Sequence, residues 1–356
     1  MKNLTRTAVL LIAALSLLCL SGCGRASRYE QAVTALESGD YESSAEYFEA
    51  LGDYKDSPAQ AESARQLAAK QTDYEKALDL VNGGAYDEAA ELFAALDGYL
   101  DSAELASQCR RDAAQANYES AVKQYRAGDY ARAEALFMSD PEYRDAGLYL
   151  TAIMLADCEV GDTVSFGNYI QDKDAETPAP IDWVVLSREE DRVLLLSEQG
   201  LDCLRFHDRL YPFWANSEMR QWLNGTFLAA AFTEGEQRLI DLSANTTRGY
   251  SSSLGVYRGG PDTEDAVFLL SKEELYEYLP EKADRICTPT PYALSAGAQT
   301  DDNGACPWWT RSPGDHYGQV CAVNADGVLD AYYRVYRTEV CVRPAIWVNF
   351  HKLTLE

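Results

Sequence analysis

The sequence predicts a multidomain protein in which an all-α array of helical repeats is followed by an α+β domain. Two observations predict this division. A pattern of tyrosine, glycine and phenylalanine recurs three times before Asp157, on a helical spacing of apolar residues. After Asp157 the apolar residues alternate as in β-strands, with helical stretches between them. We therefore expect residues 29–157 to form the repeats and residues 158–356 to form the α+β domain.

The N-terminal segment has the organisation of an export signal. Lys2 and Arg6 precede an apolar run over residues 8–20. This run is shorter than the about 20 residues that a membrane-spanning helix needs, and it is typical of a signal peptide. The segment Leu20-Ser21-Gly22-Cys23 follows directly and resembles the lipobox of bacterial lipoproteins.

The lipobox resemblance implies where the protein is located. In that family the cysteine thiol receives a diacylglyceryl group, and a peptidase cuts the chain before the cysteine. The resemblance therefore implies a signal peptide over residues 1–22, a lipid on Cys23 and a lipid-attached linker over residues 23–28. The protein is then expected outside the cytoplasm, held at the cell membrane by its lipid anchor alone. The alternative is an ordinary secretory peptide in which Cys23 is incidental.

The composition excludes general disorder and nucleic-acid binding. Hydrophobic residues make up 47% of the chain and aromatic residues 11%, which is enough to build packed cores. The formal net charge is -26, so the surface repels nucleic acid and anionic lipid. We expect neutral or basic partners.

Seven cysteines remain besides Cys19 and Cys23, and none stands in the short paired spacing of a zinc site. Outside the cytosol they can form disulfides, but an odd number leaves the pairing open. Buried free thiols and a bridge between neighbouring strands, such as Cys321 with Cys341, are both compatible with the sequence.

The repeat has a period of about 45 residues, and its members keep the same register. Each copy holds a first tyrosine, a Gly-x-Tyr turn, a phenylalanine and a closing tyrosine followed two residues later by aspartate. The first tyrosines are Tyr29, Tyr74 and Tyr118, and the closing ones are Tyr54, Tyr99 and Tyr143.

The spacing within each copy predicts paired helices. In the second copy Tyr74, Ala77, Leu78 and Val81 share one helical face, and a glycine pair ends the helix. A second helix follows, and residues 103–114 are expected to form a further one. The pattern resembles the tetratricopeptide family from Tyr29 to about Ala156, although that family repeats every 34 residues or so. The resemblance implies that the repeats bind a protein or peptide; the alternative is a spacer.

The C-terminal part is expected to contain strands, helices and further strands. Strands are predicted over residues 163–169, 181–186 and 193–196, a short buried strand over 267–270, and more strands between Trp308 and Trp347. Helices are predicted after the capping residues Ser217, Thr233 and Ser271. Residues 324–327 form a predicted turn.

Several stretches of this part resemble a domain of unknown function that is frequent in surface and secreted proteins of Gram-positive gut bacteria. They include Arg220-Gln221-Trp222-Leu223-Asn224, Trp308-Trp309-Thr310-Arg311-Ser312-Pro313-Gly314 and Val342-Arg343-Pro344-Ala345-Ile346-Trp347. The resemblance extends from Cys158 to Phe350. The element order and the paired tryptophans also resemble the C-type lectin-like fold, including its formylglycine-generating-enzyme branch.

No residue is predicted to be catalytic. His316 lies beside Asp315 in a Gly-Asp-His-Tyr-Gly loop, but the sequence has no Gly-x-Ser-x-Gly elbow to supply a nucleophile. The formylglycine-generating branch implies two copper-binding cysteines, for which Cys306, Cys321 and Cys341 are the candidates. None of these three lies in a stretch that matches the motif of that branch.

Two further places are candidate binding sites. Asp301, Asp302 and Asn303 offer clustered oxygens to calcium, and no other cofactor is expected. Trp308, Trp309 and Arg311 are candidates for an aromatic platform that binds a sugar or peptide. The favoured alternative is that the tryptophans belong to the core, with Arg311 paired to a carboxylate. Because adjacent strand residues face opposite ways, at most one ring is then buried on a given side, and the other is exposed or covered by a loop.

These observations together predict a non-catalytic envelope lipoprotein. Its helical repeats are expected to bind a protein and to present an α+β module that binds protein or glycan at the cell surface. One alternative is an oxidase of the formylglycine-generating type, or another enzyme that acts on the cell wall. A third interpretation is a structural assembly factor that acts only through its repeats.

Overall fold

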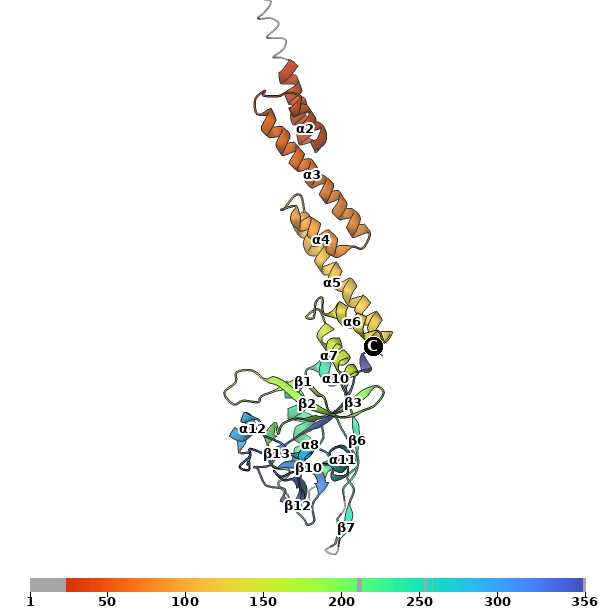
Figure 1. Cartoon of the computed structure of the whole chain (residues 1–356), viewed down its shortest axis with the longest axis vertical. Coiled ribbons are helices and arrows are strands. Elements are labelled where there is room, and N and C mark those ends of the chain that lie inside the picture. Colours follow the sequence, from red (N-terminus) through yellow and green to blue (C-terminus); the bar gives the residue numbers. More distant parts are fainter. Residues whose placement is uncertain (1–23, 210–212, 253–254, 258, 355–356) are drawn as a thin grey trace, which may run out of the picture. The chain divides into compact units, whose positions relative to one another are not determined.

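The computed structural model describes residues 24–209, 213–252, 255–257 and 259–354 (Figure 1). The predicted signal peptide and the lipidation residue Cys23 lie outside the described residues. The chain divides into two compact units, and the boundary between them falls between Asn117 and Tyr118 in the sequence. No helix in the described part of the chain combines the length and the apolar composition that a membrane span requires.

The N-terminal unit consists of alternating long and short helices. They are a helix over residues 24–37, α2 (Tyr41–Glu49), α3 (Ser57–Asn82), α4 (Tyr86–Ala95) and the first part of α5 (Ser102–Arg126). The further helix predicted over residues 103–114 is continuous with the first helix of the next copy, because no glycine or proline interrupts α5. In α3 the proline stands in the first turn, where it is tolerated.

The predicted helical repeat is confirmed, because equivalent residues make equivalent contacts in all three copies. The first tyrosine donates its hydroxyl to the aspartate 27 residues later, as Tyr29 does to Asp56 at 2.5 Å and Tyr74 to Asp101 at 2.5 Å. Tyr118 makes the same bond to Asp145. The first tyrosine also packs edge-on against the phenylalanine of its copy, with ring centroids 5.4, 5.4 and 5.8 Å apart.

The turns repeat as well. Gly39, Gly84 and Gly128 have φ of 80°, 77° and 77°, a conformation that favours glycine after a helix. The residue after each closing tyrosine also has positive φ, at 53°, 51° and 52° for Lys55, Leu100 and Arg144. The same local backbone is therefore built three times.

The third copy packs with the α+β domain. It comprises the end of α5, α6 (Tyr130–Phe137) and α7 (Ala146–Asp157), and its apolar residues share one core with the sheets. The buried Tyr125 donates its hydroxyl to the carbonyl of Phe350, near the end of the chain. The Arg188 guanidinium donates to carbonyls at the end of α7, including that of Leu155 at 3.1 Å. The unit boundary at 117/118 therefore precedes position 157/158, where the sequence pattern changes.

The remainder of this unit contains two five-stranded sheets. The first has the order β1-β2-β3-β14-β5 and is antiparallel throughout. Its strands are β1 (Thr163–Tyr169), β2 (Ala179–Arg188), β3 (Arg192–Ser197), β14 (Ala345–Asn349) and β5 (Ile240–Asp241). The second has the order β12-β11-β10-β13-β4, in which β10 and β13 are parallel. Its strands are β12 (Leu329–Arg334), β11 (Gln319–Val323), β10 (Trp308–Pro313), β13 (Cys341–Val342) and β4 (Asp202–Cys203). The predicted α+β class is confirmed.

Short helices and two ribbons connect the sheets. The helices are η1 (Trp214–Asn216), α8 (Glu218–Trp222), the π-helical η2 (Leu223–Phe227), α9 (Leu228–Ala231), α10 (Glu234–Leu239), α11 (Lys272–Tyr278), η3 (Ala283–Arg285), α12 (Pro291–Ala296) and η4 (Lys352–Thr354). The ribbons pair β6 (Ser243–Asn245) with β9 (Thr263–Asp265), and β7 (Tyr250–Ser252) with β8 (Gly255–Tyr257).

The predicted helix caps are confirmed. Ser217 accepts the backbone N–H of Arg220 at 3.0 Å, and Thr233 and Ser271 form reciprocal capping boxes. The strand predicted over residues 267–270 is wrong. That segment is buried, but its strand pairing is limited to one bridge, between Phe268 and Ala345. A continuous apolar run shows burial without showing which backbone pairs with it.

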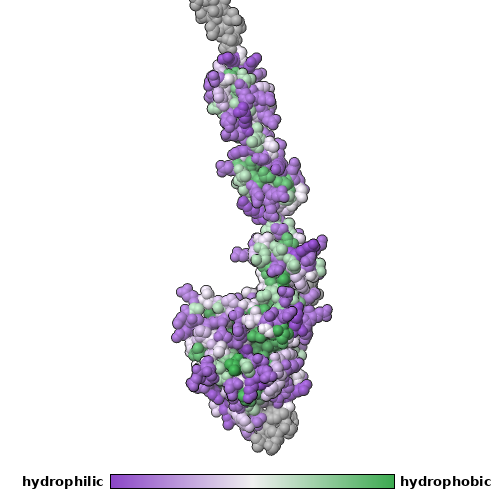
Figure 2. Space-filling view, in the orientation of Figure 1, coloured by the Kyte–Doolittle hydropathy of each residue, from purple (hydrophilic) through white to green (hydrophobic). Residues whose placement is uncertain are grey.

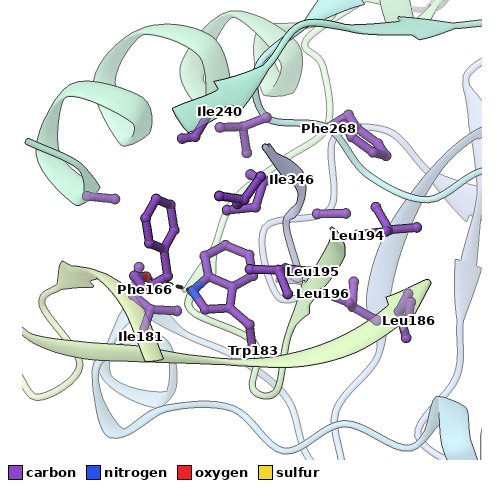
Figure 3. Close-up of a cluster of buried hydrophobic side chains, with 14 of the residues drawn as sticks. Phe166, Ile181, Trp183, Leu186, Leu194, Leu195, Leu196, Ile240, Phe268 and Ile346 are labelled. Carbon is purple, nitrogen blue, oxygen red and sulfur yellow. Dashed lines mark hydrogen bonds between the residues drawn. The ribbon is translucent and has the colours of Figure 1, made fainter. Parts of the chain in front are cut away.

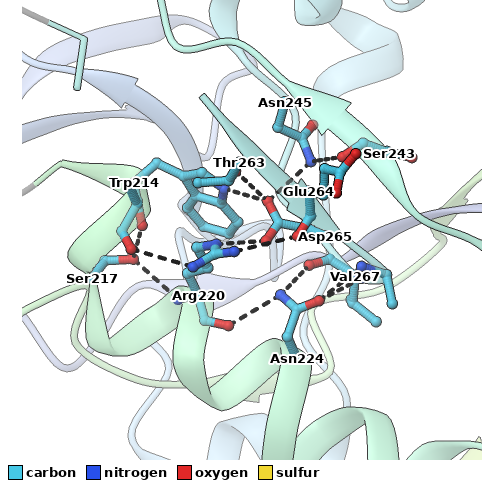
Figure 4. A network of polar contacts seen from close by, with 12 residues as sticks. Trp214, Ser217, Arg220, Asn224, Ser243, Asn245, Thr263, Glu264, Asp265 and Val267 are labelled. Atoms are coloured by element: carbon cyan, nitrogen blue, oxygen red, sulfur yellow. Dashed lines mark hydrogen bonds and ion pairs between the residues drawn. The ribbon is translucent and has the colours of Figure 1, made fainter. Parts of the chain in front are cut away.

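The core of this unit is apolar but includes satisfied polar groups. Figure 3 shows the Trp183 indole beside Phe166 and Leu195, with its N–H donated to the Phe166 carbonyl at 2.7 Å. A second buried network surrounds Asp265 and joins the helix that begins at Glu218 to β9 (Figure 4). Hydrophilic residues cover most of the face seen in Figure 2, as the acidic composition predicts.

Candidate functional site

The tryptophan pair lies in the core. Trp308 and Trp309 each have an exposed fraction of 0% and lie on opposite faces of β10, as adjacent strand residues must. Their indole N–H groups donate to the carbonyls of Arg285 at 2.9 Å and Leu204 at 2.8 Å. Segments on both sides of the sheet therefore cover the two rings.

Arg311 is also buried, with an exposed fraction of 3%. Its guanidinium donates to both carboxylate oxygens of Glu274, one of them at 2.6 Å, and to the Leu269 carbonyl at 2.7 Å. The pairing with a carboxylate is the core alternative considered for this residue. The structure therefore provides no open platform at Trp308, Trp309 and Arg311 on which a sugar or peptide could stack.

The loop considered for calcium is held by its own backbone. Asp301 Oδ1 accepts the N–H groups of Asn303 at 2.9 Å and Ala305 at 2.8 Å. Hydrogen bonds from the backbone, that of Ala305 foremost, lower the pKa of the Asp301 carboxyl. This arrangement is an ordinary Asx turn, in which the Asp301 carboxylate accepts hydrogen bonds from within the loop.

Within the described ranges, one other group has metal-ligand geometry. The ligand atoms of His207, Asp208 and Glu218 lie within 4.8 Å of one another, and His207 is buried. Both carboxylate oxygens of Glu218, however, accept hydrogen bonds from Arg205, at 2.7 and 3.2 Å. An ion would have to displace this salt bridge.

Of the two cysteine arrangements left open by the sequence, the structure has buried free thiols. All seven cysteines of the described chain are buried and unbridged. Cys321 lies on β11 and Cys341 on β13, and β10 runs between these strands, so the expected contact across neighbouring strands is wrong. Of the copper candidates, Cys306 and Cys341 are adjacent, since both sulfurs lie within 3.6 Å of a Cβ placed on Gly200, but both have an exposed fraction of 0%. The described residues therefore cover both thiols from solvent.

An exposed group of rings lies at and beside the edge strand β12. Tyr317, Tyr332 and Tyr336 have exposed fractions of 67%, 56% and 58%. The His316 ring lies 6.1 Å from that of Tyr332. We call these four residues the aromatic patch.

The rings of the patch come from β12 and from neighbouring turns. Tyr332 points outward while the next residue, Tyr333, is buried, and Tyr336 lies in the turn that follows the end of β12 at Arg334. The N–H of Val335 donates to the Gly318 carbonyl at 3.0 Å, which sets Tyr336 opposite Tyr317 in the antiparallel pairing. Tyr332 thus points outward from β12, and Tyr317 and Tyr336 are exposed residues of the turns beside it.

Hydrogen bonds hold this face in place. Asp315 accepts a hydrogen bond from the Tyr332 hydroxyl, which raises the pKa of Tyr332. Asp330 Oδ1 accepts the Tyr332 backbone N–H at 2.8 Å, and the Asp315 N–H donates to the Ala331 carbonyl at 3.0 Å. The patch thus combines positioned rings with two carboxylates, a surface that can bind a ligand without ordering its own side chains first.

The patch was missed at the sequence level, although a signal for it exists. Tyr332 and Tyr333 are adjacent in a stretch predicted to contain strands, so one of the two rings must point away from the core. The sequence prediction named Trp308, Trp309 and Arg311 as the platform instead, with burial in the core as the favoured alternative. Burial decides which rings a ligand can reach.

Comparison with known proteins identifies the domain that carries the patch. No curated protein and no solved structure matches the chain. A family model described as "Domain of unknown function (DUF6273)" matches residues 190–350, which include the aromatic patch and lie within the span 158–350 where the resemblance to an uncharacterised domain was noted. The chain therefore carries a DUF6273 domain at residues 190–350, preceded by a region of paired helices.

Proposed function

We propose that this protein is a non-catalytic, lipid-anchored lipoprotein of the bacterial envelope whose C-terminal domain binds a glycan at the aromatic patch. The helical repeats present this domain at the cell surface. The observation that carries the proposal is the exposure of Tyr317, Tyr332 and Tyr336 on and beside an edge strand. Exposed aromatic residues that gather in one region mark interaction sites in soluble domains.

The chemistry of the patch favours a neutral sugar. The apolar face of a sugar ring packs against an aromatic ring, and its hydroxyl groups donate to carboxylates. Asp315 and Asp330 stand beside Tyr332, and a carboxylate accepts several hydrogen bonds. The net charge of -26 works against nucleic acid and anionic lipid as ligands.

The resemblances to the C-type lectin-like fold and to the tetratricopeptide family also belong to this proposal. A C-type lectin-like arrangement of the α+β domain would agree with sugar binding, and a tetratricopeptide-like use of the repeats would add a protein or peptide partner. Support for the repeats as a binding surface is their regular geometry, with the same tyrosine–aspartate bond in each copy.

The glycan proposal is tested with the full chain and single substitutions. Tyr317→Ala, Tyr332→Ala and Tyr336→Ala are each expected to weaken binding to a glycan selected from cell-wall fragments, mucin glycans and plant oligosaccharides. One lost ring contact corresponds to roughly 2- to 12-fold in affinity. Tyr276→Ala is the matched control, since Tyr276 is 53% exposed on α11 and does not belong to the patch.

Two results would contradict this assignment. The first is binding by the wild-type chain that all three patch variants retain. The second is a protein partner captured by residues 24–117 and absent from captures with residues 118–356, which would favour the repeats as the sole recognition surface. The cut at 117/118 is used because a cut at 157/158 would expose the core that the third copy shares with the sheets.

The lipid anchor is tested separately. Wild-type chain expressed in a bacterium that processes lipoproteins is expected to incorporate labelled palmitate and to fractionate with membranes. Cys23→Ser should lose both properties, whereas Cys19→Ser, within the apolar run, should keep them. Palmitate incorporation by the Cys23→Ser variant would refute the anchor.

A further inference from the structure

Four of the buried cysteines form a continuous row at one end of the second sheet. Cys203 on β4 and Cys341 on β13 are directly opposite each other in an antiparallel pair. The N–H of Cys306 donates to the carbonyl of Cys287 at 2.8 Å. A Cβ atom placed on Gly200 would lie 3.1 Å from Cys341 Sγ and 3.6 Å from Cys306 Sγ, so both thiols converge on this glycine.

The four thiols are neighbours in sequence along this row. Cys306 lies beside Cys287 and Cys341, and Cys341 lies beside Cys203, since these neighbours shift the pKa values of Cys287, Cys306 and Cys341. The Cys203 thiol itself donates to the Thr338 carbonyl at 2.9 Å. The order in space is therefore Cys287, Cys306, Cys341, Cys203. The two outer thiols each have one neighbour in the row, and the two inner thiols have two.

The other three described cysteines stand apart from this row. The Cys158 thiol donates to the Leu155 carbonyl at 3.2 Å, and the Cys321 thiol donates to the Pro313 carbonyl at 3.1 Å. Cys109 belongs to the N-terminal unit. These three thiols serve as internal references for any measurement on the row.

A cation lies beside the row. Arg343 is 4% exposed, its Nε donates to the Ser197 carbonyl at 2.8 Å, and its Nη1 has no hydrogen-bond partner among the described residues. The neighbouring thiols of Cys287 and Cys341, and then the charge of Arg343, lower the pKa of the Cys306 thiol. A lower pKa favours the thiolate, which is the form that reacts with disulfides.

We propose that this row is a covalent modification site at which two disulfides form, Cys203–Cys341 and Cys287–Cys306. This pairing joins all four thiols. A bridge between Cys306 and Cys341 would instead leave the two outer thiols, those of Cys287 and Cys203, without a partner. Directly opposite strand residues have Cβ atoms about 4.5–5.5 Å apart, and a disulfide needs about 3.5–4.5 Å, so closure requires only a small approach.

The chemistry is thiol–disulfide exchange with a small or protein-borne disulfide as oxidant. One cysteine thiolate attacks a sulfur of the oxidant, whose other sulfur leaves as a thiol, and the neighbouring cysteine then displaces the remaining half. Each bridge thus consumes two protein thiols and one oxidant disulfide and releases two oxidant thiols. Because the four thiols are at most 4% exposed, the exchange takes place during folding or when the domain opens locally. The inference rests on the proposed export and is independent of glycan binding.

The test is a disulfide map of the full chain recovered from envelopes. The chain is denatured without reductant, alkylated with N-ethylmaleimide and digested for mass spectrometry. Cys109, Cys158 and Cys321 are expected to be alkylated, and the linked peptides should join Cys203 to Cys341 and Cys287 to Cys306. Reduction should make all seven thiols alkylatable and lower the midpoint of thermal unfolding by roughly 10 °C.

Two variants test which cysteines are paired. Cys203→Ser should leave the Cys287–Cys306 bridge intact and make Cys341 alkylatable, and Cys321→Ala is the matched control that should keep both bridges. A bridge between Cys306 and Cys341 would overturn the proposal. So would alkylation of all four row thiols without reductant, or their protection by a bound metal that a chelator releases. Bridges formed in chain refolded with oxidised glutathione but absent from the envelope protein would likewise overturn it.

Discussion

The buried carboxylate of Asp265 allows a strong test of how the C-terminal domain is held together. Asp265 is 1% exposed, and Arg220 Nε donates to its Oδ1 at 2.5 Å (Figure 4). Its Oδ2 accepts from Trp214 Nε1 at 2.8 Å, Asn245 Nδ2 at 3.0 Å and Thr263 Oγ1 at 2.6 Å. In Asp265→Asn the charge is lost, and the new amide must present its NH₂ group either to Arg220 or to the three donors on the other side.

The expected loss of stability is large. Removing one partner of a buried ion pair costs about 3–5 kcal/mol, and each buried donor left without an acceptor costs about 1–3 kcal/mol. The Arg220 side chain is 27% exposed, so water relieves part of its loss, whereas Trp214 and Asn245 are buried. We expect Asp265→Asn to reduce the free energy of unfolding by about 3–4 kcal/mol.

Tryptophan fluorescence during urea denaturation of the full chain measures this change. The six tryptophans all follow residue 118, so the signal reports on the C-terminal unit alone. Asp302→Asn, an exposed carboxylate in the 301–304 loop, is the matched control and should stay within about 0.5 kcal/mol of the wild type. A loss below about 1 kcal/mol in Asp265→Asn, or one no larger than the control, would refute the reasoning.

Two further predictions concern the tyrosines of the repeats. Tyr125→Phe leaves the buried Phe350 carbonyl without its donor. We expect this change to lower the unfolding free energy of the C-terminal unit by about 1–2 kcal/mol in the same urea assay. An unchanged midpoint would show that the third copy does not stabilise the domain through this bond. The hydrogen bond to Asp101 raises the pKa of Tyr74 to about 12. Between pH 10 and 12 the folded chain therefore keeps a proton on Tyr74 that the unfolded chain loses. The free energy of unfolding falls as the pH rises through this window. The difference in tyrosinate absorbance between wild type and Tyr74→Phe should therefore titrate near pH 12, and a midpoint near 10 would contradict the bond.

Local patterns predicted the local structure of this protein well. The Thr233 and Ser271 capping boxes and the glycines that end the repeat helices depend on residues at most four positions apart. The fused helix α5 was also visible in the sequence, because residues 103–126 contain neither glycine nor proline. The strand expected over 267–270 failed because strand formation requires a pairing partner that the segment itself does not specify.

The sequence by itself determined the helical repeat, the order of elements in the α+β domain and the acidic character of the surface. These depend on side-chain period, capping and composition, which act between near neighbours in the chain. Only the tertiary structure decided that Trp308 and Trp309 are buried while Tyr332 is exposed, and that Cys341 lies beside Cys203 and Cys306 instead of Cys321. Those outcomes depend on strand order and on which distant segments cover each face of a sheet. Chain positions more than 100 residues apart become neighbours only when the sheets assemble.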